Sequence, residues 1–144
     1  MAKALILYAS RTGETTKIGN LIAEGLRMSG IETDVKDVKS IKEETELEGY
    51  DALVLGSATY HGDMMQPMKT FLFMAEKADL KNKAGGAFGA FGWSGEAPDR
   101  IFDTMKHIFG MKMAANALRL KSSLLDGAIA AAQAYGKEIA GLIG

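Results

Sequence analysis

Apolar residues form short, nearly continuous runs at three places in the chain. Residues 4–9, within an expected strand at 3–9, and residues 52–56 and 85–91 are apolar or small throughout, which is typical of strands buried on both faces of a parallel sheet. The segment 31–38 alternates apolar with charged residues, so we expect it to be a strand at a sheet edge. A fifth strand is expected near 113–120.

Segments with helical apolar spacing separate these strands. We expect helices near 14–28, 65–77 and 124–143, with one more after 92–97. The charged segment 39–49 is expected to be a surface loop with at most a helical turn. The side chains expected to face inward are Met68, Phe71, Leu72 and Ala75 in the second helix, Ile101, Met105 and Ile108 in the third, and Ile129, Ala132, Gly136, Ile139 and Ile143 in the fourth.

The alternation of strands and helices predicts an α/β fold with a doubly wound parallel sheet, in one domain over residues 1–144. In such sheets ligands bind beyond the carboxyl ends of the strands, where the strand order reverses. The strands at 3–9, 52–56 and 85–91 are the apolar, central ones. The loops that follow them, 10–15, 57–63 and 92–97, are therefore expected to converge on one site.

Composition narrows the functions that this site can have. The 144 residues are 47% apolar and 24% charged, with a net charge of −1 and no cysteine. A net charge so close to zero does not indicate a basic surface that binds nucleic acid. The lack of cysteine excludes disulfides, thiolate metal sites and a cysteine nucleophile. The first strand begins almost at the N-terminus, and no apolar run reaches the ~20 residues that span a bilayer. We expect a cytoplasmic protein without a membrane partner.

The loop Ser10-Arg11-Thr12-Gly13-Glu14-Thr15 joins an apolar strand to a helix. A helix start presents unpaired N–H donors and the positive end of the helix dipole, and three hydroxyls and a glycine add to them. This combination predicts a phosphate site, although the same residues are also common as a simple helix cap. No Lys follows in the pattern of nucleoside triphosphate sites, so we expect a phosphate monoester held by neutral donors.

The other two loops each contain an aromatic residue beside glycines. Tyr60 lies before His61 and Gly62, and Trp93 lies between Gly92 and Ser94. A phosphate pocket with two aromatic side chains suggests a flat conjugated ring with a phosphorylated tail, and flavin mononucleotide (FMN) fits that description. Other readings stay open: Tyr60 packs on the following helix, Trp93 contacts a partner protein, and His61 is a solvated loop residue.

The chain resembles the flavodoxins over its whole length, through three segments. These are the phosphate loop 10–15, the second loop Gly56-Ser57-Ala58-Thr59-Tyr60 and the third loop Phe91-Gly92-Trp93-Ser94-Gly95. The short region near the fifth strand resembles the short-chain branch of the family. The resemblance implies a three-layer α/β/α sandwich with a five-stranded parallel sheet in the order 2-1-3-4-5, and FMN as the cofactor.

The resemblance also implies roles for individual residues. The hydroxyls of the phosphate loop would hold the phosphate together with backbone N–H groups, Tyr60 and Trp93 would flank the flavin ring, and backbone groups of 92–95 would meet its polar edge. In the family a peptide in the second loop turns over on reduction, and Gly62 would give it the needed freedom. The full set expected to bind FMN is Ser10, Arg11, Thr12, Gly13, Glu14, Thr15, Ser57, Ala58, Thr59, Tyr60, His61, Gly62, Phe91, Gly92, Trp93, Ser94 and Gly95.

The function that the resemblance implies is low-potential electron transfer. The protein would pass single electrons from a donor reductase or oxidoreductase to an acceptor enzyme, as a monomer or weak dimer, without catalytic residues or a metal. Carboxylates near the flavin, among them Asp63, Glu96 and Asp99, would disfavour its reduced anion. Two alternatives remain open: an FMN-dependent NAD(P)H or quinone reductase, whose relatives usually carry extra segments, and a module that binds FMN for regulation.

Overall fold

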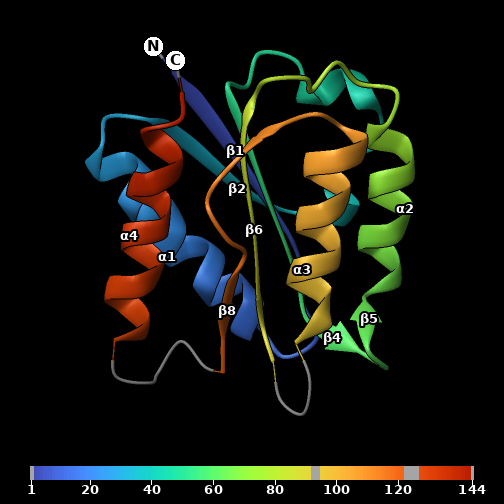
Figure 1. The fold of residues 1–144 in the computed structure, drawn as a ribbon. Coiled ribbons are helices and arrows are strands. Elements are labelled where there is room, and N and C mark those ends of the chain that lie inside the picture. The colour runs from blue at the N-terminus through green and yellow to red at the C-terminus, as the bar shows by residue number, and fades with distance from the viewer. Residues whose placement is uncertain (1, 92–94, 122–126, 144) are drawn as a thin grey trace.

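The computed structural model describes residues 2–91, 95–121 and 127–143. Strands alternate with helices along the chain (Figure 1). The strands are β1 (Lys3–Ala9), β2 (Glu32–Asp37), β3 (Ala52–Ser57), β4 (Thr59–Tyr60), β5 (Asp63–Met64), β6 (Ala84–Ala90), β7 (Lys112–Met113) and β8 (Leu118–Leu120). The helices are α1 (Glu14–Met28), α2 (Gln66–Ala75), α3 (Glu96–Asp103) and α4 (Ala128–Ala140), with short turns η1 (Val38–Ser40), η2 (Glu44–Leu47) and η3 (Thr104–Ile108).

The main sheet has the order β2-β1-β3-β6-β7, and β8 also pairs with β6. All of these pairs are parallel. Ile6 of β1 lies opposite Val35 of β2 and Val54 of β3, which fixes the register of the inner strands. The expected order 2-1-3-4-5 is confirmed, with β6 as the fourth strand and β7 and β8 together as the fifth. The half-polar strand β2 lies at an edge, as its alternating sequence predicts.

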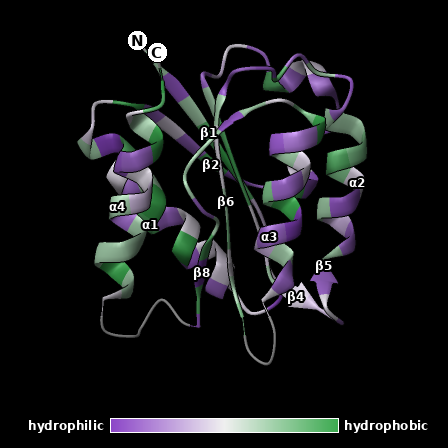
Figure 2. Cartoon of the chain, viewed as in Figure 1, coloured by the Kyte–Doolittle hydropathy of each residue, from purple (hydrophilic) through white to green (hydrophobic). Residues whose placement is uncertain are grey.

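The sheet is buried on both faces, and this explains why its inner strands are apolar throughout. Helices α1 and α4 cover one face and α2 and α3 the other (Figures 1 and 2). Alternate residues of β1 enter different cores: Leu5 and Leu7 pack under α2 and α3, whereas Ala4 and Ile6 pack under α1 and α4. All four side chains are fully buried. A fully buried Leu or Ile stabilises the fold by roughly 1.5–3 kcal/mol.

Helices α1 and α4 approach each other so closely that glycine is required in both. A Cβ atom added at Gly25 would lie 2.0 Å from the carbonyl oxygen of Gln133, and one added at Gly136 would lie 2.2 Å from that of Ile22. Neither backbone can retreat without disturbing its helix. The predicted inward position of Gly136 is therefore confirmed, and the reason is the close contact between α1 and α4.

The third helix does not continue regularly, and the prediction that Ile108 faces inward is wrong. The N–H of Phe109 donates to the carbonyl oxygen of Thr104, five residues earlier, at 3.1 Å. This π-helical turn widens the helix by one residue. The inward row therefore runs through Ile101, Met105 and Phe109, while Ile108 is 64% exposed.

Ile129 is also misplaced by the sequence analysis, because it is 54% exposed. Helix α4 begins at Ala128, and its inward row starts there and continues through Ala132 to Ile139. Ile129 is one residue further along and so points about 100° away from that row. The predicted inward positions Ala132, Gly136 and Ile139 are confirmed, and Ile143, beyond the end of α4, is half-buried against the same core.

The fifth strand is divided into β7 and β8, although the sequence predicts one strand near 113–120. The Tyr135 hydroxyl from α4 reaches the gap: it lies 2.7 Å from the carbonyl oxygen of Asn116 and accepts from the N–H of Ala87 of β6 at 3.1 Å. Glu138 accepts from the N–H of Ala115 at 2.7 Å. Burial raises the pKa of the Tyr135 phenol, so it stays a donor. Side chains of α4 thus replace the missing ladder bonds.

No helix within 2–91, 95–121 or 127–143 is both long enough and apolar enough to cross a membrane.

Candidate functional site

The first loop, between β1 and α1, is held by its own residues. The N–H of Gly13 donates to the Ser10 hydroxyl oxygen at 2.9 Å, which closes the turn. Gly13 has φ +88° and precedes α1 as its cap residue. Only glycine adopts this left-handed conformation without strain. The turn thereby places the start of α1 directly after the carboxyl end of β1.

Thr15 is the buried polar group of this loop. Its side chain is 1% exposed, and its hydroxyl oxygen has no hydrogen-bond partner in the described structure. An unpaired buried hydroxyl is costly, so its position at the positive end of α1 calls for an acceptor from a ligand. The phosphate of FMN supplies such an acceptor, and the residues of this loop therefore fit the cofactor.

The second loop, predicted simply as a loop over 57–63, forms a β-hairpin. Tyr60 lies opposite Asp63 in the antiparallel pair β4–β5. The two residues between them, His61 and Gly62, have φ +51° and +72°. Positive φ at both central residues defines the tight turn typical of two-residue hairpins. The His-Gly dipeptide is the signal that could have revealed it, since His is enriched among non-glycine residues with positive φ.

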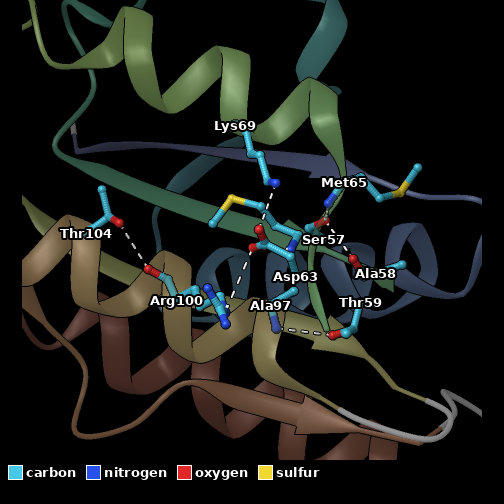
Figure 3. Close-up of polar contacts among 10 residues, drawn as sticks. Ser57, Ala58, Thr59, Asp63, Met65, Lys69, Ala97, Arg100 and Thr104 are labelled. Atoms are coloured by element: carbon cyan, nitrogen blue, oxygen red, sulfur yellow. Dashed lines mark hydrogen bonds and ion pairs between the residues drawn. The ribbon is translucent and has the colours of Figure 1, made fainter. Parts of the chain in front are cut away.

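Two hydroxyls connect the second loop to the helices that follow it. The buried Ser57 hydroxyl donates to the Ala58 carbonyl oxygen at 2.8 Å and accepts from the N–H of Met65 at 2.9 Å. The Thr59 hydroxyl accepts from the N–H of Ala97 in the first turn of α3 at 3.1 Å (Figure 3). Thr59 therefore caps a helix 38 residues away in sequence.

Asp63 joins the hairpin to α2 and α3 (Figure 3). Its carboxylate lies 2.7 Å from the Lys69 ammonium and 3.9 Å from the Arg100 guanidinium, and it accepts from the N–H of Met64 at 2.8 Å. The hydrogen bond with Lys69 is the main reason that the pKa of Asp63 is lowered. Because two cations compensate this carboxylate, it repels a nearby anion less than its sequence position suggests.

Tyr60 is 47% exposed and is contacted from two sides. The guanidinium carbon of Arg11, in the first loop, lies 4.6 Å from the centre of the Tyr60 ring. The His61 ring meets it edge to face, with ring centres 4.2 Å apart and planes at 69°. Arg11 is expected to bind FMN, but the sequence does not predict its contact with Tyr60, because the two residues are far apart in the chain.

The third loop is described only at its two ends. At one end, the N–H of Phe91 donates to the carbonyl oxygen of Leu120 at 3.0 Å, which extends the pairing of β6 with β8. At the other, Gly95 precedes α3 as its cap residue. The predicted site residues Gly92, Trp93 and Ser94 lie outside the described residues.

The described parts of the three loops meet at the carboxyl edge of the sheet. The contact of Arg11 with Tyr60 joins the first loop to the second, and the bond from Ala97 to Thr59 joins the second to the start of α3. The site combines a buried, unpaired Thr15 hydroxyl at the start of α1 with the exposed aromatic ring of Tyr60. Both are features of a binding site for a ring with a phosphorylated tail.

Comparison with known proteins gives matches over most of the chain. A family model described as a flavodoxin domain matches residues 5–131. Among solved structures, one described as a flavodoxin from the domain Archaea superimposes with a TM-score of 0.91 at 30% identity, and the match covers 98% of each chain.

Two curated relatives are larger proteins. A putative diflavin flavoprotein, A 5, of Nostoc sp. strain PCC 7120 is 36% identical over 124 residues, which are 81% of this chain and 21% of the relative. An NAD(P)H dehydrogenase (quinone) of Archaeoglobus fulgidus is 31% identical over 122 residues, with 68% of this chain and 64% of the relative covered. The chain thus spans about a fifth of the first and somewhat less than two thirds of the second.

Proposed function

Because the chain belongs to the flavodoxin domain family and has FMN as its cofactor, we propose that it is a low-potential electron carrier. In this role it accepts one electron at a time from a donor reductase or oxidoreductase and gives one to an acceptor enzyme. The full-length similarity to the archaeal flavodoxin supports the proposal, because that match covers 98% of both chains.

The observation that carries the proposal is the unpaired Thr15 hydroxyl at the start of α1. It supports a phosphate site in the place where the family binds its cofactor. When bound, FMN supplies the redox chemistry, and the protein supplies binding, orientation and electrostatics. In our proposal Ser10, Thr12 and Thr15 bind the phosphate together with backbone N–H groups of the first loop.

The second loop acts on the ring. We propose that Tyr60 lies against one face of the flavin, and that the hairpin presents its turn, His61 and Gly62, to the polar edge. The exposure of Tyr60 supports a cofactor whose edge is open to a partner protein. Electron transfer to a docked partner needs no acid–base residue and no substrate pocket, so positioning is the main task of the chain.

The test is anaerobic electron relay by the purified protein loaded with FMN. A flavin-containing NADPH reductase is the donor, and cytochrome c is the one-electron acceptor. We expect cytochrome c reduction to require this protein and to saturate as its concentration rises. A loaded protein that leaves the rate of cytochrome c reduction unchanged would overturn the carrier role.

A second candidate is an NAD(P)H-linked quinone reductase, favoured by the 31% identity to the Archaeoglobus fulgidus NAD(P)H dehydrogenase (quinone). In that reaction NAD(P)H gives two electrons and a proton, and the quinone takes the two electrons with that proton and a second one from the solvent. Steady oxidation of NAD(P)H by the loaded protein and a quinone, with no added reductase, would support this candidate. The carrier predicts no turnover under those conditions.

A further inference from the structure

The contact between the Arg11 side chain and Tyr60 is not needed for the electron transfer proposed above. Arg11 is exposed and forms no ion pair within the described part of the chain. Its guanidinium lies instead over the Tyr60 ring, 4.6 Å from the ring centre. A guanidinium stacks well on an aromatic face because it is planar, delocalised and weakly hydrated.

This contact uses one of the two faces of the Tyr60 ring. The His61 ring meets the Tyr60 ring edge to face, with the two planes at 69°. Tyr60 is nevertheless 47% exposed, so part of its side chain stays accessible to a ligand. A flat group bound on the side of the ring opposite Arg11 would stack on Tyr60, with the guanidinium behind the ring.

We infer that Arg11 is a positioning residue that holds Tyr60 for the flavin through this stack. The inference rests on the proposed function, in which Tyr60 lies against the flavin. Arg11 restricts the ring before FMN arrives and so lowers the ordering cost of binding. Its charge, one ring behind the flavin, also favours the anionic reduced cofactor, so it raises the reduction potential.

Arg11 also belongs to the phosphate loop, and a simple attraction of its charge to the phosphate would strengthen FMN binding too. The two roles differ in their dependence on the Tyr60 ring. A stack loses its effect when the ring is removed, whereas an attraction to phosphate does not. Lys17 provides a matched control, because it is an exposed cation on α1 and makes no cation–ring contact with Tyr60 among the described residues.

The first experiment is a double-mutant cycle on the protein without cofactor, with urea unfolding as the measurement. The variants are R11Q, Y60L and the double variant, with Y60F as the control that keeps the ring. We expect R11Q to lower the equilibrium ratio of folded to unfolded protein by about two- to fivefold when Tyr60 is present. In the Y60L background, R11Q should leave this ratio unchanged. Additive effects would overturn the stack.

The second experiment measures FMN dissociation and reduction potentials for R11Q, R11K and K17Q. We expect R11Q to weaken FMN binding by about two- to fivefold, only where the ring is present. R11Q should also shift the potential of the last electron more negatively than K17Q does, and R11K should recover most of that shift. Equal effects of R11Q and K17Q on both quantities would overturn the positioning role.

The two experiments separate this inference from the proposed function. If the wild-type protein failed to relay electrons while the cofactor-free cycle still showed coupling, the carrier role alone would fail. If electron relay succeeded and the cycle was additive, the role of Arg11 alone would fail.

Discussion

The first and second loops of the site are fixed in opposite ways. In the first loop, the Ser10 hydroxyl accepts a hydrogen bond from the N–H of Gly13, three positions later, and helix α1 follows directly. In the second, Ser57 bonds to Met65, and Thr59 caps a helix that begins 37 residues later. A loop held by neighbours in sequence keeps its shape by itself, whereas the hairpin keeps its shape only while α2 and α3 are in place.

The largest effect is expected on FMN affinity, at the residue of the first loop whose hydroxyl is free to bond to the ligand. Replacing Thr15 with Val keeps the shape and removes the buried hydroxyl, which has no partner in the described structure. A hydrogen bond to a charged group is worth about 1.5–3 kcal/mol, so FMN affinity should fall by roughly 10- to 100-fold. Fluorescence titration with FMN measures this.

The matched control for that change is Thr16→Val, on the next position of α1. It should leave FMN affinity within about a factor of two. The free energy of unfolding of the cofactor-free Thr15→Val protein should be unchanged or slightly higher, because an unsatisfied group is lost. A clear loss of stability without FMN would contradict our account of Thr15.

The turn of the hairpin should give the next largest effect. Gly62 has φ +72° and open space around the position of a Cβ, so Gly62→Ala introduces backbone strain without a clash. The strain should cost about 1–2 kcal/mol of unfolding free energy. Gly49→Ala is the control, since Gly49 has φ +87° and open space as well. We expect both variants to lose a similar amount of stability and only Gly62→Ala to change the reduction potential of the bound FMN.

The long-range cap should come third. Thr59→Val removes the acceptor for the N–H of Ala97 and should lower the free energy of unfolding by about 1 kcal/mol. Urea unfolding measures this loss, and hydrogen exchange should rise at the start of α3. Thr45→Val, on the exposed turn η2, should have a smaller effect, because the Thr45 hydroxyl has only a 3.4 Å contact with Glu43. Equal losses would show that Thr59 does not join the second loop to α3.

The ion pair should have the smallest effect. Asp63→Asn removes the pairing with Lys69, and a partly exposed pair contributes about 0.2–1 kcal/mol at neutral pH. The pKa of Asp63 is lowered in the folded protein, so its contribution is complete above the ordinary Asp pKa and is lost as the pH falls through the lower, folded value.

The difference in unfolding free energy between wild type and Asp63→Asn should therefore be largest near pH 7 and smaller in acid. It should also shrink at high salt, because salt screens exposed charges. A difference that grows as the pH falls would contradict the assigned sign.

Much of this fold could be predicted because the deciding interactions are local or repeat along the chain. Side chains of the inner strands pack into a core on each face of the sheet, so the segment from Leu5 to Leu7 is apolar without interruption. The first loop can be recognised from its hydroxyl residues and Gly13. The sequence could not show contacts between distant segments. The π-turn that turns Ile108 outward depends on packing around Phe109, and the Tyr135 bond depends on how α4 crosses the sheet.

The site divides in the same way. The residue types of the second loop were recognised, but its hairpin pairing, and the contact of Tyr60 with Arg11, require the three-dimensional structure. The cofactor roles of the individual loop residues stay predictions until FMN binding is measured in the variants above.

The division of the last strand has a consequence for how copies of this protein meet. An exposed strand can recruit a strand from another chain if it offers a long, regular row of backbone groups. Within the described residues, one border of the sheet offers two residues of β7 and three of β8, interrupted by the Tyr135 side chain from α4. The opposite border, β2, carries Glu32, Asp34 and Lys36. Both borders therefore resist edge-to-edge aggregation, and crowded molecules keep their sheets separate.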